Sequence, residues 1–211
     1  MVNGIIAVII AYLLGSIPSA YIITRLATGK DIRRLGGGNV GARNVLREVG
    51  KWAGAGVGIF DVGKGIAAVA IAHWLLGAPQ FFVLAAAVAV VVGHIWSVYL
   101  KFTGGNGLAT SIGVLAMLMT RELLIALAVT LLLVVITRNP VLSINISLLS
   151  VPISGWFLEK SWVLVVFSVV LLVIMIINFI PTARAALDKA GSKENLSAEL
   201  LRKDKAGEEE K

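Results

Sequence analysis

The stretch Gly36-Gly37-Gly38-Asn39-Val40-Gly41-Ala42-Arg43-Asn44-Val45-Leu46-Arg47 is the most polar and most flexible segment of an otherwise apolar chain. Four glycines within six positions let backbone N–H groups turn toward one side, and a concave run of amides binds anions such as phosphate. Cations and amide side chains surround these glycines, namely Arg33, Arg34, Arg43, Arg47, Asn39 and Asn44. The stretch therefore predicts a phosphate-binding loop, with a flexible basic loop that only sets membrane topology as the alternative.

The composition of the whole chain is typical of an integral membrane protein. Of its 211 residues 58% are hydrophobic, and the mean hydropathy is +0.91. The net charge of +7 indicates loops that face anionic lipid headgroups rather than nucleic acid. The chain has no cysteine and two histidines, His73 and His94. The absence of cysteine excludes disulfides and thiolate catalysis, and two histidines far apart in the sequence provide no set of metal ligands.

Seven apolar segments predict an all-α membrane protein, a seven-transmembrane-helix bundle with short cytoplasmic glycine-rich loops. The segments are residues 1–24, 52–76, 80–96, 108–120, 123–137, 139–158 and 161–180. Gly15 and Pro18 are expected to loosen the first helix. The segment 108–120 is about one turn short, so we expect it to start inside the protein body. Residues 1–183 form the expected membrane domain, and residues 184–211 form a charged tail expected to be disordered.

Charge predicts the direction of these spans. With the segment 25–51 in the cytoplasm, sixteen of the nineteen lysines and arginines lie inside, two lie outside and Lys64 lies within a span. This asymmetry follows the positive-inside rule. It predicts a multi-pass protein whose N-terminus is outside and whose C-terminus is cytoplasmic, with the polar segments sharing the cytoplasmic face.

Two further polar features accompany the first loop. Asp61 and Lys64 share one helix face, and we expect an ion pair that orients the helix, with Lys64 as the partner that contacts a ligand. A second glycine-rich loop, with Gly104, Gly105, Asn106 and Gly107, leads into a helix whose first turn includes Thr110 and Ser111. Two glycine loops on one membrane face suggest two phosphate groups, or one phosphate held from two sides.

Polar residues elsewhere are expected to serve packing. No acid or second histidine lies near His94 in the sequence to act as a relay partner, so packing is the expected role of His94. Asn178 lies near the cytoplasmic end of the last span, where a buried amide needs partners, and helix packing is its simplest role.

These residues resemble the acyl-phosphate-dependent glycerol-3-phosphate acyltransferases, a bacterial inner-membrane family of phospholipid synthesis. The resemblance covers roughly residues 15–110 well and the remainder weakly. The matching motifs are Leu14-Gly-Ser-Ile-Pro18, Asp31-Ile-Arg33, Gly38-Asn39-Val40-Gly41-Ala42, Asn44-Val-Leu-Arg47, Asp61-x-x-Lys64-Gly65, Gly93-His94 and Leu100-Lys-Phe-x-Gly-Gly-x-Gly-x-Ala-Thr110. The resemblance implies a seven-helix bundle with a cytoplasmic site. It also implies acyl transfer from acyl phosphate to the 1-hydroxyl of glycerol 3-phosphate, giving lysophosphatidic acid and phosphate.

The chain departs from the family pattern at several positions. Gly37 replaces a serine, Arg43 a threonine and Asn106 a lysine. Met175 replaces a histidine, and apolar residues rather than basic ones follow Asn178. The alternative function is therefore a divergent paralogue that acylates another acceptor or binds a lipid phosphate without turnover.

From the residues and the resemblance together, catalysis is predicted at Arg47 and Asn39. Binding of substrate or phosphate is predicted at Gly36, Gly37, Gly38, Gly41, Arg43, Asn44, Lys64, Gly104, Gly105, Asn106, Gly107, Thr110 and Asn178. The expected partners are acyl phosphate, glycerol 3-phosphate and membrane lipids, with no nucleic acid, metal or cofactor.

Overall fold

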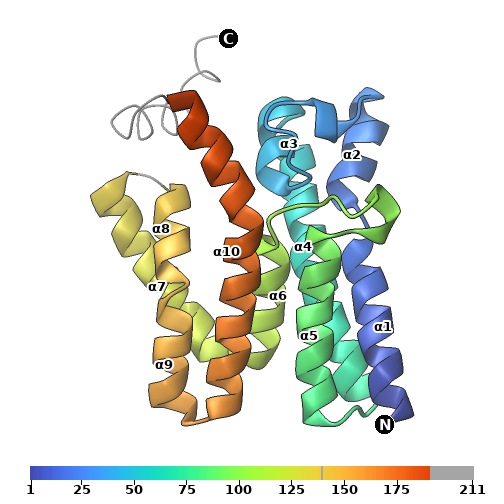
Figure 1. Ribbon diagram of the computed structural model, residues 1–211, viewed down its shortest axis with the longest axis vertical. Coiled ribbons are helices and arrows are strands. Elements are labelled where there is room, and N and C mark those ends of the chain that lie inside the picture. Colours follow the sequence, from blue (N-terminus) through green and yellow to red (C-terminus); the bar gives the residue numbers. More distant parts are fainter. Residues whose placement is uncertain (139, 191–211) are drawn as a thin grey trace.

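The computed structural model describes residues 1–138 and 140–190, and every regular element within them is helical (Figure 1). The α-helices are α1 (Val2–Ser16), α2 (Ser19–Thr28), α3 (Ala42–Glu48), α4 (Lys51–Ala70), α5 (Gln80–Ile95), α6 (Leu108–Leu118), α7 (Thr120–Thr137), α8 (Pro140–Ser147), α9 (Ser150–Glu159) and α10 (Trp162–Ala190). Short 3₁₀ turns, η1 (Ile32–Arg34) and η3 (Val98–Leu100), and a π-helical turn, η2 (Ile71–Leu75), complete the described chain.

Five helical segments of the described chain are long and apolar enough to cross a membrane. They are Val2–Thr28, Lys51–Leu75, Gln80–Leu100, Thr120–Thr137 and Leu142–Glu159. Two shorter apolar helices, Leu108–Leu118 and Trp162–Asn178, occupy the other two predicted spans. An all-helical membrane protein is therefore confirmed, and the count of seven crossings stays a prediction.

The first span is broken where the sequence predicted a loosened helix. α1 ends at Ser16 and α2 begins at Ser19. Ile17 has ψ of 115°, because the ring of Pro18 disfavours helical geometry in the preceding residue. At the break the Ile17 carbonyl accepts from the Ser19 N–H at 3.1 Å, and it also accepts from a side chain of α4 in the site described below.

Glycines let two pairs of helices pack with their backbones in close contact. A Cβ on Gly15 of α1 would lie 2.8 Å from the Val90 carbonyl carbon of α5, and one on Gly93 would lie 3.0 Å from the Ser16 nitrogen. Gly65 of α4 and Gly113 of α6 face each other's helices in the same way. In lipid there is no hydrophobic driving force between helices, so their association depends on the close packing that small residues allow.

The second half of the chain differs in three places from the expected boundaries. α7 begins at Thr120, so Glu122 lies inside the helix and is buried rather than flanking it. The segment predicted as one span over residues 139–158 is divided into α8 and α9, since Pro152 has no N–H for the Leu148 carbonyl. α10 continues to Ala190, beyond the expected domain boundary at residue 183, and residues 191–211 lie outside the described chain.

The loops that carry the predicted site gather at one end of the bundle (Figure 1). α2, α3 and the loop between α5 and α6 lie at this end, and the carboxyl end of α10 rises toward it. The N-terminus lies at the opposite end. The predicted polar features therefore share one end of the molecule.

Candidate active site

The Asn44 side chain holds the first glycine loop, residues 36–41, in a defined shape. Its Nδ2 donates to the carbonyls of Asn39 at 3.0 Å and Leu35 at 3.1 Å, and more weakly to that of Ile32 at 3.5 Å. Asn44 is buried, and Ile32 and Val45 pack in a small apolar cluster under the loop. Asn44 therefore supports the loop, and its contact with a substrate phosphate stays a prediction.

Backbone geometry requires glycine at two positions of this loop. Gly36 and Gly38 have φ of +53° and +72°, values that favour glycine. A Cβ on Gly38 would also lie 3.1 Å from the Arg33 carbonyl oxygen. At Gly37, by contrast, a Cβ would meet nothing within 4 Å, and its φ is not among the positive values. A serine would therefore fit at position 37 without strain.

The arginines around this loop have different surroundings. Arg33 pairs with Asp31, with Nη2 2.7 Å from Oδ2, and lies 5.4 Å over the Tyr21 ring. The hydrogen bond from the Arg33 side chain lowers the pKa of Asp31 to about 2. Arg33 therefore fixes the entry to the loop, whereas Arg43 and Arg47 are exposed on α3.

The second glycine loop, residues 104–107, meets the first loop and the last helix. The Val40 N–H donates to the Gly104 carbonyl at 3.4 Å, which joins the two loops. Asn178 of α10 donates its side-chain amide to the Gly105 carbonyl at 3.2 Å. Segments far apart in the sequence thus converge, as expected from two glycine loops on one face, and Asn178 has a loop partner rather than a helix partner.

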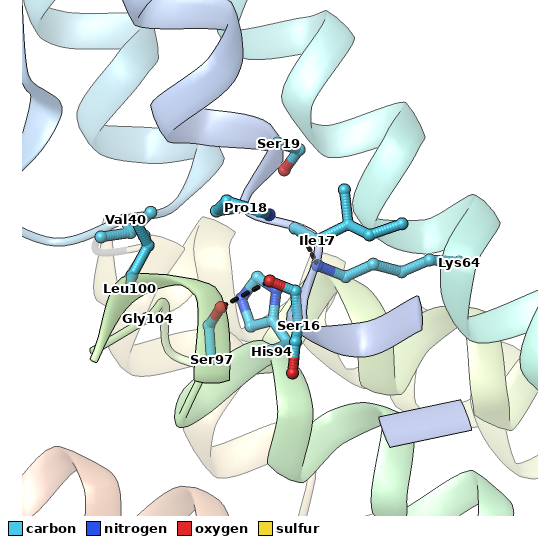
Figure 2. Close-up of a pocket in the computed structure, with 10 residues that line it drawn as sticks. All are labelled: Ser16, Ile17, Pro18, Ser19, Val40, Lys64, His94, Ser97, Leu100 and Gly104. Atoms are coloured by element: carbon cyan, nitrogen blue, oxygen red, sulfur yellow. Dashed lines mark hydrogen bonds between the residues drawn. The ribbon is translucent and has the colours of Figure 1, made fainter. Parts of the chain in front are cut away.

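Four buried side chains lie beneath the two loops, and we call Ser19, Asp61, Lys64 and His94 the polar junction. Asp61 Oδ1 accepts from Ser19 Oγ at 2.7 Å and lies 2.9 Å from Lys64 Nζ and 3.6 Å from His94 Nδ1. The side chains of Asp61 and Lys64 are 1% and 2% exposed. Lys64 Nζ also donates to the Ile17 carbonyl at 3.2 Å, as Figure 2 shows. The carboxylate therefore connects α2, α4 and α5.

His94 carries this connection up to the second loop. Its backbone carbonyl accepts from the Gly105 N–H at 3.1 Å. Its ring also abuts Gly105, because a Cβ there would lie 3.1 Å from His94 Cε1. Packing was the expected role of His94, because no acid lies near it in the sequence, but the structure places Asp61 Oδ1 3.6 Å from its Nδ1. Asp61 is 33 positions away in the sequence, and only the packing of α4 against α5 brings the two residues together.

A small cavity of about 10 Å³ lies between the junction and the loops (Figure 2). Lys64 and His94 of the junction line it, together with Val40 and Gly104 of the two loops. This volume is close to the minimum for one water molecule, and the lining supplies polar partners. The cavity is therefore suited to a water between the junction and the loops.

The remaining predicted site residues differ in accessibility. Asn106 is exposed at the tip of the second loop, and Gly107 has φ of +83°. Thr110 is fully buried, and its hydroxyl has no hydrogen-bond partner in the described structure. Ser111 Oγ lies 3.6 Å from the sulfur of Met175, the residue that replaces the family's histidine. Within residues 1–138 and 140–190, no three His, Cys, Asp or Glu side chains are grouped to hold a metal.

Comparison with known proteins relates this arrangement to a family. The family model described as "Glycerol-3-phosphate acyltransferase" matches residues 5–189. "Glycerol-3-phosphate acyltransferase 1" of Dehalococcoides mccartyi is 39% identical over 195 residues, covering 90% of this chain and 94% of that protein. "Glycerol-3-phosphate acyltransferase 2" of the same species is 42% identical over 192 residues, covering 91% of each.

Solved structures agree with this result. The crystal structure of PlsY (YgiH), an integral membrane glycerol 3-phosphate acyltransferase, in its glycerol 3-phosphate form has a TM-score of 0.79 at 30% identity. The matched region covers 88% of this chain and 92% of the PlsY chain. The lysophosphatidic acid form has a TM-score of 0.77 at 28% identity, with the same coverage. The chain belongs to the glycerol-3-phosphate acyltransferase family.

Proposed function

We propose that this protein transfers an acyl group from an acyl phosphate to the 1-hydroxyl of glycerol 3-phosphate, giving lysophosphatidic acid for phospholipid synthesis. The main structural support is the meeting of the two glycine loops, where Val40 bonds to Gly104 and Asn178 bonds to Gly105. Membership of the glycerol-3-phosphate acyltransferase family and the two crystal structures named for glycerol 3-phosphate and lysophosphatidic acid support the acceptor and the product.

The chemistry asks little of the protein beyond positioning and charge. The hydroxyl oxygen of glycerol 3-phosphate attacks the acyl carbon, the bond to the phosphate oxygen breaks, and inorganic phosphate leaves. Acyl phosphate is already a mixed anhydride, so no acyl-enzyme is needed. Arg47, Asn39 and the loop amides would hold the leaving phosphate and stabilise its charge. The leaving inorganic phosphate would take the proton of the attacking hydroxyl. Bringing the two substrates together supplies much of the rate.

The polar junction would act through the loops. Asp61 fixes His94 and Lys64, and His94 supports Gly105 of the second loop. Small misplacement of a reacting group lowers the rate strongly. We therefore assign Asp61 and His94 as positioning residues, and Lys64 as a buried cation whose charge would attract a substrate phosphate toward the loops.

The proposed location is the bacterial inner membrane, with the loops in the cytoplasm and the N-terminus outside. The chain lacks cysteine, so Asn3→Cys and Ala190→Cys can each be labelled alone in intact cells and in inverted membranes. An impermeant maleimide should label position 3 from outside and position 190 only in inverted membranes. Labelling of both positions from one side would reject this topology.

Purified protein supplied with palmitoyl phosphate and glycerol 3-phosphate tests the activity. We expect equal amounts of released phosphate and lysophosphatidic acid. The matched pair of variants is Arg47→Ala and Lys51→Ala, which each remove one exposed cation, from α3 and from the start of α4. Loss of product in Arg47→Ala alone supports the proposed site, and equal loss in both variants contradicts it.

One observation favours a second candidate, a paralogue with a different acceptor. Met175 contacts Ser111 and leaves no imidazole at that position. Phosphate release from palmitoyl phosphate that requires an added alcohol other than glycerol 3-phosphate would support this candidate. Release that saturates with glycerol 3-phosphate would reject it.

A further inference from the structure

A second cationic site lies beside the first glycine loop. A hollow of about 380 Å³ is lined by Arg25, Lys30, Asp31, Arg34 and Leu35. None of the residues assigned above to substrate binding or catalysis lines it. Leu35 immediately precedes Gly36, so this hollow and the first glycine loop are neighbours.

The hollow carries an excess of positive charge. Its one acid, Asp31, is already held by the guanidinium of Arg33 at 2.7 Å, and Arg33 does not line the hollow. Arg25, Lys30 and Arg34 make no salt bridge with an acid anywhere in residues 1–138 and 140–190. Three cations in one concave surface, with their nearest acid neutralised by a fourth, attract an anion.

The end of α2 does not cancel this attraction. A helix carboxyl terminus carries about half a negative charge. Arg25 donates to the carbonyl of Gly29, the residue that caps α2. A guanidinium has five N–H donors, so others remain available to a ligand. Lys30 and Arg34 are exposed.

The position of the hollow selects the kind of anion. α2 ends at Thr28, which is also the end of the first candidate span. Leu26, next to Arg25, is 83% exposed, as expected for a side chain that faces lipid. Arg25 lies in the last turn of this span, and Lys30 and Arg34 follow its end closely, so all three cations lie at the level of the headgroups. A phosphate group attached to an acyl chain can fill the hollow while its chain runs along Leu26.

We propose that Arg25, Lys30 and Arg34 form a binding site for the phosphate headgroup of an anionic membrane lipid, separate from the catalytic loops. This site would hold a charged amphiphile next to the loops that act on such molecules. The binding itself does not depend on acyl transfer, so it can be tested without substrates.

The test uses the full-length protein in detergent, titrated with dioleoylphosphatidylglycerol and followed by native mass spectrometry. This lipid is neither donor nor acceptor in the proposed reaction. The pocket variant is Lys30→Gln/Arg34→Gln, and the matched control is Lys51→Gln/Arg138→Gln, which removes two exposed cations elsewhere. Each cation near a membrane surface is worth about a fivefold change in affinity. We expect about 25-fold weaker binding in the pocket variant and less than about twofold in the control.

Three further arms settle the identity of the ligand. Phosphatidylcholine should bind parent protein and pocket variant equally, and sodium phosphate at the lipid's concentration should not displace the lipid. Arg47→Ala should leave lipid binding unchanged. Equal loss in the pocket variant and the control, displacement by sodium phosphate, or loss of binding in Arg47→Ala would each overturn the proposal. Thermal unfolding of both double variants checks that they are folded.

Discussion

Two carboxyl groups are buried in the described part of this bundle, and their surroundings are opposite. Asp61, beneath the glycine loops, has a serine, a lysine and a histidine around it. Glu122, near the start of α7, is fully buried, and neither of its oxygens has a partner in the described structure. A buried charge is tolerated where it is paired and hydrogen-bonded. The polar junction is thus built around its acid, whereas the first turn of α7 is not.

The comparison predicts its largest effect at Asp61. Asp61→Ala removes the acceptor of Ser19 and leaves the Lys64 ammonium buried without its counter-charge. Breaking one side of a buried ion pair costs about 3–5 kcal/mol. Thermal unfolding in detergent should show this loss as a large fall in Tm.

A double variant tests the reason for that loss. Asp61→Ala/Lys64→Met removes both charges, so it should unfold at a higher temperature than Asp61→Ala alone. A double variant that is less stable than Asp61→Ala would mean that the loss is not caused by an uncompensated lysine.

Arg47 tests whether the chemistry depends on an exposed residue beside the glycine loops, in contrast to the buried pair of Asp61 and Lys64. Arg47→Ala should lower kcat/KM by about 100-fold or more, with little change in Tm because the side chain is exposed. Arg47→Lys should recover little activity, because an ammonium cannot reproduce the fork of a guanidinium. Steady-state kinetics with palmitoyl phosphate measure both. Full activity in Arg47→Ala would remove Arg47 from the site.

A smaller effect is expected where the loops have exchanged charges relative to the family. Asn106→Lys should lower KM for glycerol 3-phosphate by about tenfold if Asn106 is a simple loss of a phosphate contact. If Arg43 already supplies that charge, Asn106→Lys alone should leave KM unchanged. Only the double variant Asn106→Lys/Arg43→Thr should then lower KM. A double-mutant cycle separates the two cases. Additive effects of the two changes would exclude coupling between Arg43 and Asn106.

The smallest effect is expected at Glu122. Glu122→Met keeps the length of the side chain and removes both unpartnered oxygens. Replacing buried polar atoms that have no partner is neutral or stabilising, so the change should stay within about 1 kcal/mol. Unfolding measured beside the Asp61 variants gives the contrast. A large loss of stability in Glu122→Met would show that Glu122 has a partner, and the comparison would fail.

Hydropathy and glycine patterns predicted the helices and the two glycine loops, because these signals are local in the sequence. Apolar length placed the helices, Pro18 marked the break between α1 and α2, and two glycine-rich stretches marked the loops that meet. The support that Asn44 gives to its loop and the acidic neighbour of His94 could not be predicted, since they depend on which loop carbonyl or carboxylate packing brings near. Glu122 was expected to flank a span, because charge in a sequence usually marks a boundary.

The hydrogen bond from Asn178 to Gly105 has a consequence for how the protein is made. The loop at Gly105 is synthesised before its partner, because Asn178 lies on α10, 73 residues later in the chain. The second glycine loop therefore acquires this contact only after α10 has been made. Synthesis and activity are thereby ordered in time, and a chain cut short before α10 would insert its first helices yet lack the complete site.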